Sequence, residues 1–140
     1  MSYMFCNCSN LSSINLDSFN TSNVKSMTQM FSACSSLKKL NLNNFDTSNV
    51  TCTRGMFHGC GELIELDIRN FNTSNVNGMY GMFAQCSNIT KIDLSNFDIS
   101  NVRNMGEMFM CCNSLESIDL SSFKRSKVSS APRIFRVAKV

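Results

Sequence analysis

The sequence predicts an α/β solenoid of stacked repeat units, each contributing one short parallel strand and one short helix. Two observations carry this prediction. The first is a strict period of 26 residues, which no insertion or deletion interrupts over the 140 residues of the chain. The second is that apolar residues recur at fixed places in the period, although one unit alone has too few of them to close a core. Stacked units bury continuous apolar columns instead.

Phenylalanine marks the period most clearly, because ten of the eleven Phe residues fall in two columns. These columns are Phe5, Phe31, Phe57, Phe83 and Phe109, and Phe19, Phe45, Phe71, Phe97 and Phe123. A third column holds Cys8, Cys34, Cys60, Cys86 and Cys112. We expect all three columns to lie in the core.

A strand is predicted shortly after the cysteine of each unit. In the first unit, Ile14 and Leu16 alternate with polar neighbours, which is typical of a strand with one buried face. Because the pattern returns in every unit, we expect five strands that pair in parallel as one narrow sheet.

A helix is predicted between Val24 and Cys34, where apolar residues are spaced three, three, one and three apart. Gln29 and Glu107 complete a capping-box pattern in two of the units. The residues at the expected N-cap are Ser26, Cys52, Gly78, Asn104 and Ser130, four of them of a capping type.

The unit as a whole, Met-Phe-x-x-Cys-x-x-Leu-x-x-Leu-x-Leu-x-x-Phe-x-Thr-Ser-Asn-Val, resembles the bacterial surface protein 26-residue repeat, a BspA-like leucine-rich repeat. The resemblance implies a leucine-rich-repeat solenoid that is a non-catalytic part of a larger exported protein. It also implies adhesion, protein binding and an extracellular or cell-surface location. The residues themselves contain no signal peptide and no transmembrane segment.

Domain organisation follows from the period. We expect a single domain, 1–140, of five units over residues 1–130 and a partial sixth unit, 131–140, with a basic tip. Residues 1–123 carry 7 basic and 10 acidic groups, whereas residues 124–140 carry 6 basic groups and no acid. A basic tip binds acidic surfaces, but no nucleic-acid module accompanies it, so we expect no nucleic-acid partner.

The sequence predicts no enzyme, no cofactor and no metal site. An enzyme needs converging acid, base or nucleophile groups, and His58 is the single histidine. We expect His58 to be solvated or locally bonded. The cysteines lack zinc-site spacing, so we expect reduced thiols packed as small hydrophobes, with Cys6, Cys52 and Cys111 the most exposed. A thiol- or metal-responsive protein using the cysteine column stays an alternative.

The outward strand positions form a mixed, polar surface without aromatic residues. Two interpretations stay open: a partner-binding sheet face, or an ordinary solvated face. The candidate residues are Lys39, Asn41, Asn43, Glu65, Asp67, Arg69, Lys91, Asp93 and Asp119. Because like charges repel across a sheet, we expect the aspartates to be solvated or paired with cations. The Thr-Ser-Asn segments after the second Phe column are predicted to lock turns by side-chain hydrogen bonds.

The two ends suggest self-association. Solenoids need polar caps, yet the first unit is as apolar as the middle ones and the last is incomplete. We therefore predict a non-catalytic scaffold for protein–protein interaction, including head-to-tail contacts that give a filament or stacked assembly. The candidate contacts are Met1, Met4, Phe5, Val128, Arg133, Ile134, Phe135 and Arg136. The alternative is a fragment of a larger cell-surface adhesin.

Overall fold

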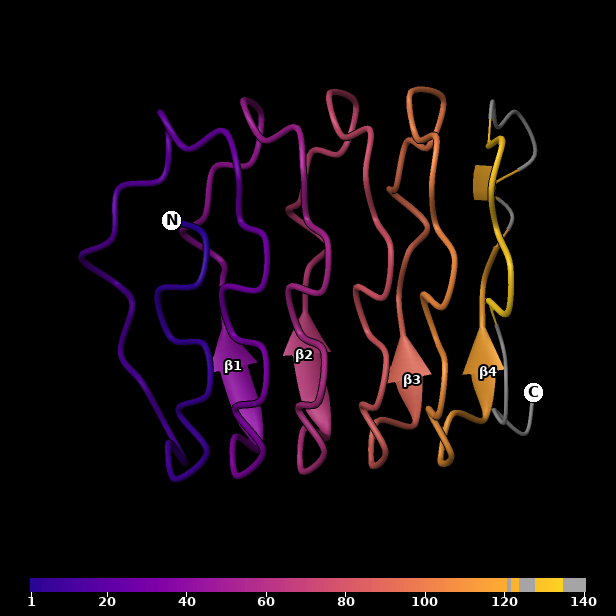
Figure 1. The fold of residues 1–140 in the computed structure, drawn as a ribbon. Coiled ribbons are helices and arrows are strands. Elements are labelled where there is room, and N and C mark those ends of the chain that lie inside the picture. The colour runs from indigo at the N-terminus through magenta and orange to yellow at the C-terminus, as the bar shows by residue number, and fades with distance from the viewer. Residues whose placement is uncertain (121, 124–127, 135–140) are drawn as a thin grey trace.

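The computed structural model describes residues 1–120, 122–123 and 128–134. Successive units lie side by side along one direction (Figure 1), and we number them 1 to 5 over residues 1–26, 27–52, 53–78, 79–104 and 105–130, with unit 6 from residue 131. Four short strands run the same way: β1 (Lys39–Asn41), β2 (Glu65–Asp67), β3 (Lys91–Ile92) and β4 (Ser117–Ile118). The chain therefore has a repeat fold with parallel strands.

The strands pair in parallel, and their register equals the sequence period. Lys39 lies opposite Glu65 in the β1–β2 pair, and Lys91 lies opposite Ser117 in the β3–β4 pair. The expectation of one five-stranded sheet was wrong, because the described strands form two pairs and unit 1 has none. The strand half of unit 1 swings away from unit 2 (Figure 1) and leaves Leu11 and Ile14 only partly buried.

A second series of parallel backbone bridges, in addition to the paired strands, connects the units at the place where helix N-caps were expected. Parallel bridges link Ser26, Cys52, Gly78, Asn104 and Ser130 in an unbroken series. These residues therefore join neighbouring units rather than begin helices.

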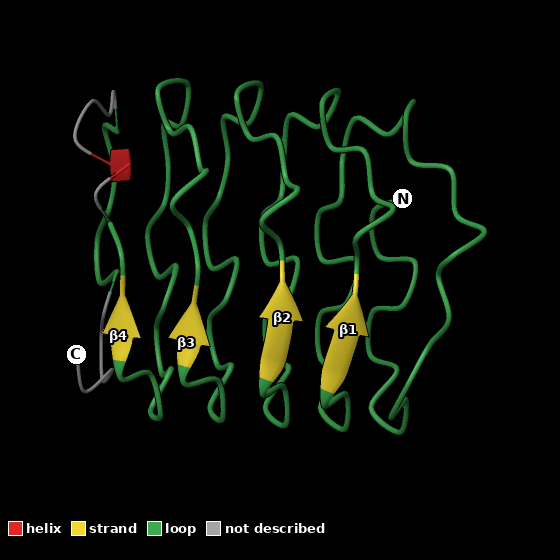
Figure 2. Cartoon of the chain, turned by 180° about the vertical axis from the view of Figure 1, so that it is seen from behind, coloured by secondary structure: helices red, strands yellow, loops and turns green. Residues whose placement is uncertain are grey.

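The predicted helices are absent, since the described residues contain no α-helix, and the short helical segment drawn red in Figure 2 is a 3₁₀ turn at residues 122–123. The amides of Gln29 and Phe31 donate across to the carbonyls of Arg54 and Met56 in the next unit, at 2.8 and 2.9 Å. The intervening amide of Met30 donates instead three residues back, to Met27, at 3.2 Å. An α-helix needs every amide to bond four residues back, so this alternation excludes it.

Left-handed residues accompany the alternation. Gln29 has φ 51° and Ala33 has φ 58°, and the same two places of the other units also have positive φ wherever they are described. A left-handed residue breaks a right-handed helix. The apolar spacing of three, three, one and three thus reflects consecutive tight turns that all place their apolar side chains inward.

The core confirms the predicted columns. Phe5, Phe31, Phe57, Phe83 and Phe109 stack in order, with ring centroids 5.4, 6.0, 5.7 and 5.6 Å apart and planes within 14° of parallel. Offset-stacked rings at this separation attract one another in addition to the gain from burial. The same side chain thus packs on its copy from unit to unit.

Side-chain hydrogen bonds lock the turns, as the Thr-Ser-Asn segments predicted. Thr47 Oγ1 donates to the Asn72 carbonyl at 3.1 Å and accepts from the Asn72 amide at 2.8 Å. Asn70 Nδ2 lies 3.0 Å from the carbonyl oxygen of Leu42 and 3.1 Å from that of Phe45, both in the preceding unit. These contacts satisfy backbone groups between units, where strands are too short to do so.

Candidate functional site

The predicted sheet face lies on the outer side of the strands, and its residues alternate with buried ones. Leu40 and Leu42 are buried, whereas Lys39, Asn41 and Asn43 between and beside them are exposed. The remaining residues of the face are Glu65, Arg69, Lys91, Asp93 and Asp119, which are exposed, and Asp67, which is half-buried. The strands thus bring all nine residues to one surface.

Salt bridges neutralise part of this surface. Lys39 Nζ lies 2.8 Å from Glu65 Oε1, across the β1–β2 pair. Arg69 binds Asp67 in bidentate fashion, with Nε 3.0 Å from Oδ1 and Nη2 2.8 Å from Oδ2. These hydrogen bonds lower the pKa of Asp67 to about 2. The expectation that cations partner the aspartate column is confirmed at Asp67.

Asp93 is held differently. It accepts hydrogen bonds from the Ser95 amide at 3.0 Å and from Ser95 Oγ at 2.7 Å, and these bonds lower the pKa of its carboxyl group. Lys91 has no salt bridge among the described residues. This end of the face therefore carries charges that are available to a partner.

Two shallow hollows mark the sheet face. One of about 470 Å³ includes Ile64, Leu66, Arg69 and Lys91 in its lining. The other, of about 650 Å³, lies over β3 and β4 and includes Lys91, Asp93, Ser117 and Asp119. Ile64 is 45% exposed at the first hollow, so the face contains an apolar contact point beside its charges.

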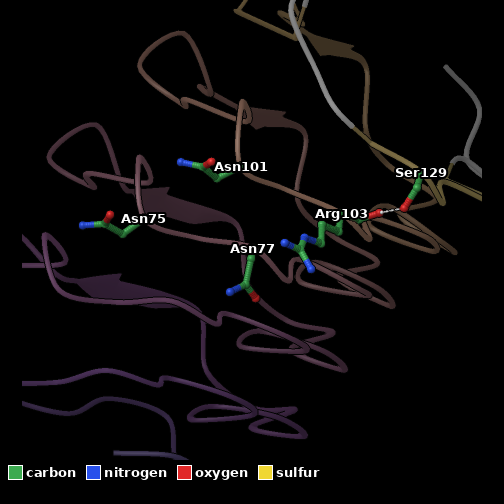
Figure 3. Close-up of a pocket in the computed structure, with 5 residues that line it drawn as sticks. All are labelled: Asn75, Asn77, Asn101, Arg103 and Ser129. Atoms are coloured by element: carbon green, nitrogen blue, oxygen red, sulfur yellow. Dashed lines mark hydrogen bonds between the residues drawn. The ribbon is translucent and has the colours of Figure 1, made fainter.

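A third hollow, of about 520 Å³, lies along another edge of the units (Figure 3). Asn75 and Asn101 use their amide groups to bind carbonyls of the preceding unit, Ser48 and Ser74, each at 2.7 Å. Arg103 points toward this hollow from the same edge. The sequence predicted these asparagines only as turn residues.

A fourth hollow, of about 150 Å³, lies on the tight turns and was missed entirely. Its lining residues are Gln29, Arg54, Gly55, His58, Tyr80, Gly81 and Glu107. The Arg54 guanidinium lies over the Tyr80 ring, 5.2 Å from its centroid. A signal for it was present: units 3 and 4 have Gly where units 2 and 5 have Gln29 and Glu107.

The residues expected to form end-to-end contacts are in two groups. In unit 1, Met4 is 47% exposed and its neighbour Tyr3 56%, whereas Met1 and Phe5 are half-buried against the core. Toward the other end, Val128 and Ile134 are half-buried and Arg133 Nη1 lies 3.9 Å from Glu107 Oε1. Phe135 and Arg136 lie outside the described residues.

Four cysteines of the column make hydrogen bonds between units. The thiols of Cys34, Cys60, Cys86 and Cys112 each donate to the carbonyl of the first-column Phe in the preceding unit, at 3.1 Å. Burial raises the pKa to about 12 for Cys60 and for Cys112. All eight cysteines are free thiols, and Cys6, Cys52 and Cys111 are half-exposed, as expected. Cys8, which was expected in the core, is also half-exposed, because unit 1 has no preceding unit in this structure to cover it. Among the described residues, no cluster of His, Cys, Asp or Glu is arranged to hold a metal ion.

No helix in the part of the chain that the structure describes has the length and apolarity to cross a membrane.

Comparison with known proteins gives one family. No curated protein and no solved structure matches the chain. The family described as "Mycoplasma protein of unknown function, DUF285" matches twice, over residues 1–91 and 62–140, and overlapping matches are what a repeat produces. The chain belongs to this family of repeat proteins.

Proposed function

We propose that the chain is a non-catalytic scaffold for protein–protein interaction, built as a leucine-rich-repeat solenoid. The observation that carries this proposal is the ordered sheet face. Parallel pairing fixes the backbone of β1 with β2 and of β3 with β4 in the register of the repeat, and neighbouring strands of a sheet lie about 4.8 Å apart. A rigid, extended polar surface loses little conformational freedom on binding a protein.

The resemblance to the BspA-like repeat supports the same role, and with it a place on a cell surface. Ile64, Lys91 and Asp93 offer apolar and charged contacts near one another. Such a mixed surface fits a protein partner better than a small molecule, because small-molecule sites are mostly apolar and enclosed.

A second copy of the chain is the partner that the backbone favours. At the tight turns, amides of one unit donate to carbonyls of the next, as from Tyr3 to Thr28 and from Glu107 to Pro132. Among the described residues, the carbonyls of Ser2 and Met4 in unit 1 therefore have no backbone donor, and the amide of Arg133 in unit 6 has no backbone acceptor. Acceptors at one end and a donor at the other favour head-to-tail association. Head-to-tail contacts that do not close into a ring produce an open filament.

Sedimentation or light scattering of the 140-residue chain at increasing concentration tests self-association. We expect the mean mass to rise with concentration for the unchanged chain. We call the side of unit 1 that carries the carbonyls of Ser2 and Met4 its open edge. Met4→Lys places a charge on this open edge and should keep the chain monomeric. Ile64→Lys is the matched control, because it charges a similarly exposed apolar residue on the sheet face.

The two variants show whether association uses the edge of unit 1 or the sheet face. Loss of association in Ile64→Lys but not in Met4→Lys would assign the contact to the sheet face. A monomer at high concentration and low salt would rule out end-to-end association and leave the sheet face as the site for a different protein.

A further inference from the structure

The hollow on the tight turns gathers residues that differ from unit to unit. At the place of Arg54 and Tyr80, the other units have Ser2, Thr28, Gly106 and Pro132. His58, the single histidine, lines the same hollow. The core of the chain repeats strictly, whereas Arg54, Tyr80 and His58 break the repeat and line one hollow. Polar and titratable side chains that meet in this way indicate a local site rather than a packing requirement.

The hollow exists because two side chains are missing. Gly55 and Gly81 have φ 58° and 60°, but Gln29 and Glu107 have φ 51° and 57° at the same place of their units. The backbone therefore tolerates a side chain there, at the cost of a left-handed non-glycine residue. A Cβ on Gly55 would lie 3.1 Å from Gln29 Cγ, so side chains at these two places would occupy the space that the glycines leave open.

The acidic group of the hollow is already engaged. The Glu107 carboxylate interacts with the Tyr80 hydroxyl and raises the pKa of Tyr80. Arg133 Nη1 lies 3.9 Å from the same carboxylate. Glu107 thus serves to hold Tyr80 in place, and Tyr80 in turn supports the guanidinium of Arg54 at 5.2 Å.

The groups left to bind a ligand are mainly donors. Among the described residues, Arg54 has no salt bridge, and no hydrogen bond joins the side chains of Gln29 or His58 to another residue. A guanidinium stacked on a ring presents its planar edge, whose paired N–H groups match a carboxylate. One water molecule occupies about 30 Å³ in the liquid. A hollow of about 150 Å³ therefore holds a few water molecules, and one acidic side chain can replace them.

We propose that this hollow binds a single Asp or Glu side chain of a partner protein, with Arg54 forming the bidentate contact to the carboxylate and Gln29 and His58 supporting it. The site is separate from the sheet face and from the open edge of unit 1. It therefore goes beyond the proposed function and stands whether or not the chain self-associates. Phosphate fits less well, because a dianion would meet Glu107 and only one free arginine.

The probe is N-acetyl-aspartyl-N-methylamide, which has one carboxylate, and N-acetyl-asparaginyl-N-methylamide is its neutral match. Each probe is titrated into the isotope-labelled chain, and NMR chemical shifts are measured. The signals monitored are the Arg54 Nε–H, the Gly55 and Gly81 amides and the His58 ring. We expect saturable shifts at these groups with a millimolar dissociation constant for the aspartyl probe alone. Inorganic phosphate is titrated in parallel.

Three variants locate the site. Arg54→Gln should weaken binding about ten-fold or more, as expected for loss of a charge-assisted pair. Arg103→Gln removes another exposed arginine, at a different hollow, and should leave binding unchanged. Gly81→Gln introduces the residue that unit 2 has in the same backbone conformation, and it should fill the hollow and abolish binding.

Several results overturn the proposal. Equal binding of the asparaginyl probe would show that the carboxylate is not recognised. Equal loss in Arg54→Gln and Arg103→Gln would show nonspecific attraction to cations. Tighter binding of phosphate would assign the hollow to another ligand class, and absence of saturable shifts would remove the site. Should Gly81→Gln not fold, the two arginine variants still decide the question.

Discussion

At the scale of single residues, the fully buried phenylalanines hold neighbouring units together. Phe57 is 0% exposed and lies between Phe31 and Phe83, at 6.0 and 5.7 Å. Phe57→Ala should lower the free energy of unfolding by about 3–5 kcal/mol, because it leaves a cavity between two rings. Urea denaturation followed by circular dichroism measures this loss. Tyr3→Ala, at an exposed position, is the control; similar small losses in both variants would contradict the stacked core.

The Arg69–Asp67 pair makes a prediction about pH. The Arg69 side chain lowers the pKa of Asp67 to about 2, whereas an unfolded aspartate titrates near 3.9. The stabilisation by this pair is therefore complete above about pH 4 and is lost as the pH falls through about 2. The Arg69 side chain is exposed and that of Asp67 is only partly buried, so the contribution is small.

Arg69→Gln should move the pKa of Asp67 upward, toward the ordinary value. Carboxyl-detected NMR titration measures the change directly. Lys39→Gln, which removes the cation of the other salt bridge on the face, should leave the pKa of Asp67 where it is. An unchanged pKa in Arg69→Gln would show that the bidentate contact does not form in solution.

At the scale of the element, the repeated tight turn depends on left-handed residues. Gly59 has φ 74°, and a Cβ there would lie 3.5 Å from the Cα of Ala33. Gly59→Ala should cost about 1–2 kcal/mol through backbone conformation alone. The fold should survive, because Ala33 adopts φ 58° at the same place of unit 2.

Gly61→Ala is the matched control, since a Cβ added at Gly61 would have no atom within 4 Å and the φ of this residue is not positive. Its stability should stay within about 0.5 kcal/mol of the unchanged chain. Thermal melts of the two variants measure the difference. Equal melting temperatures would mean that the turn is not left-handed at Gly59.

The threonine lock is the second element-scale feature. Thr47 is buried, and its hydroxyl bonds both the amide and the carbonyl of Asn72. Thr47→Val should cost about 1–3 kcal/mol, because it leaves these backbone groups unpaired. Valine fits by shape, since Ile99 occupies the same place in unit 4. Chemical denaturation measures the cost against Ser35→Ala, whose exposed hydroxyl makes only a 3.4 Å contact to Ser9.

At the scale of the whole molecule, the cysteine column reports on global unfolding. Four cysteines are buried and four are half-exposed. Burial raises the pKa of the Cys34 thiol to about 11 and that of Cys60 to about 12, so the reactive thiolate is scarce at neutral pH. We expect Ellman's reagent at pH 8 to titrate only the half-exposed thiols until denaturant unfolds the chain.

This titration also distinguishes a structural repeat protein from a redox-responsive one. Inert buried thiols fit a structural column that donates hydrogen bonds between units. Rapid reaction of Cys60 and Cys86 in the folded chain, identified by mass spectrometry, would favour the redox-responsive alternative instead.

The candidate surfaces were predictable in unequal measure. Alternation of polar and apolar residues around Leu40 and Ile92 sufficed to place Lys39, Lys91 and Asp93 on one face. The hollow at Arg54 was not predicted, because its residues come from successive units and are recognised as neighbours only once the turns are known to bring them together. Its one sequence signal was the replacement of a side chain by Gly55 and Gly81.

The sequence by itself determined the period, the register and the core, because identical apolar residues at a fixed interval have only one arrangement in which each packs on its copy. Tertiary structure alone decided the form of the segment from Val24 to Cys34. Its apolar spacing suits a helix and a series of tight turns equally well. The turns prevail because alternate amides, such as those of Gln29 and Phe31, bond to the adjacent unit, and a single unit considered alone contains no such acceptors.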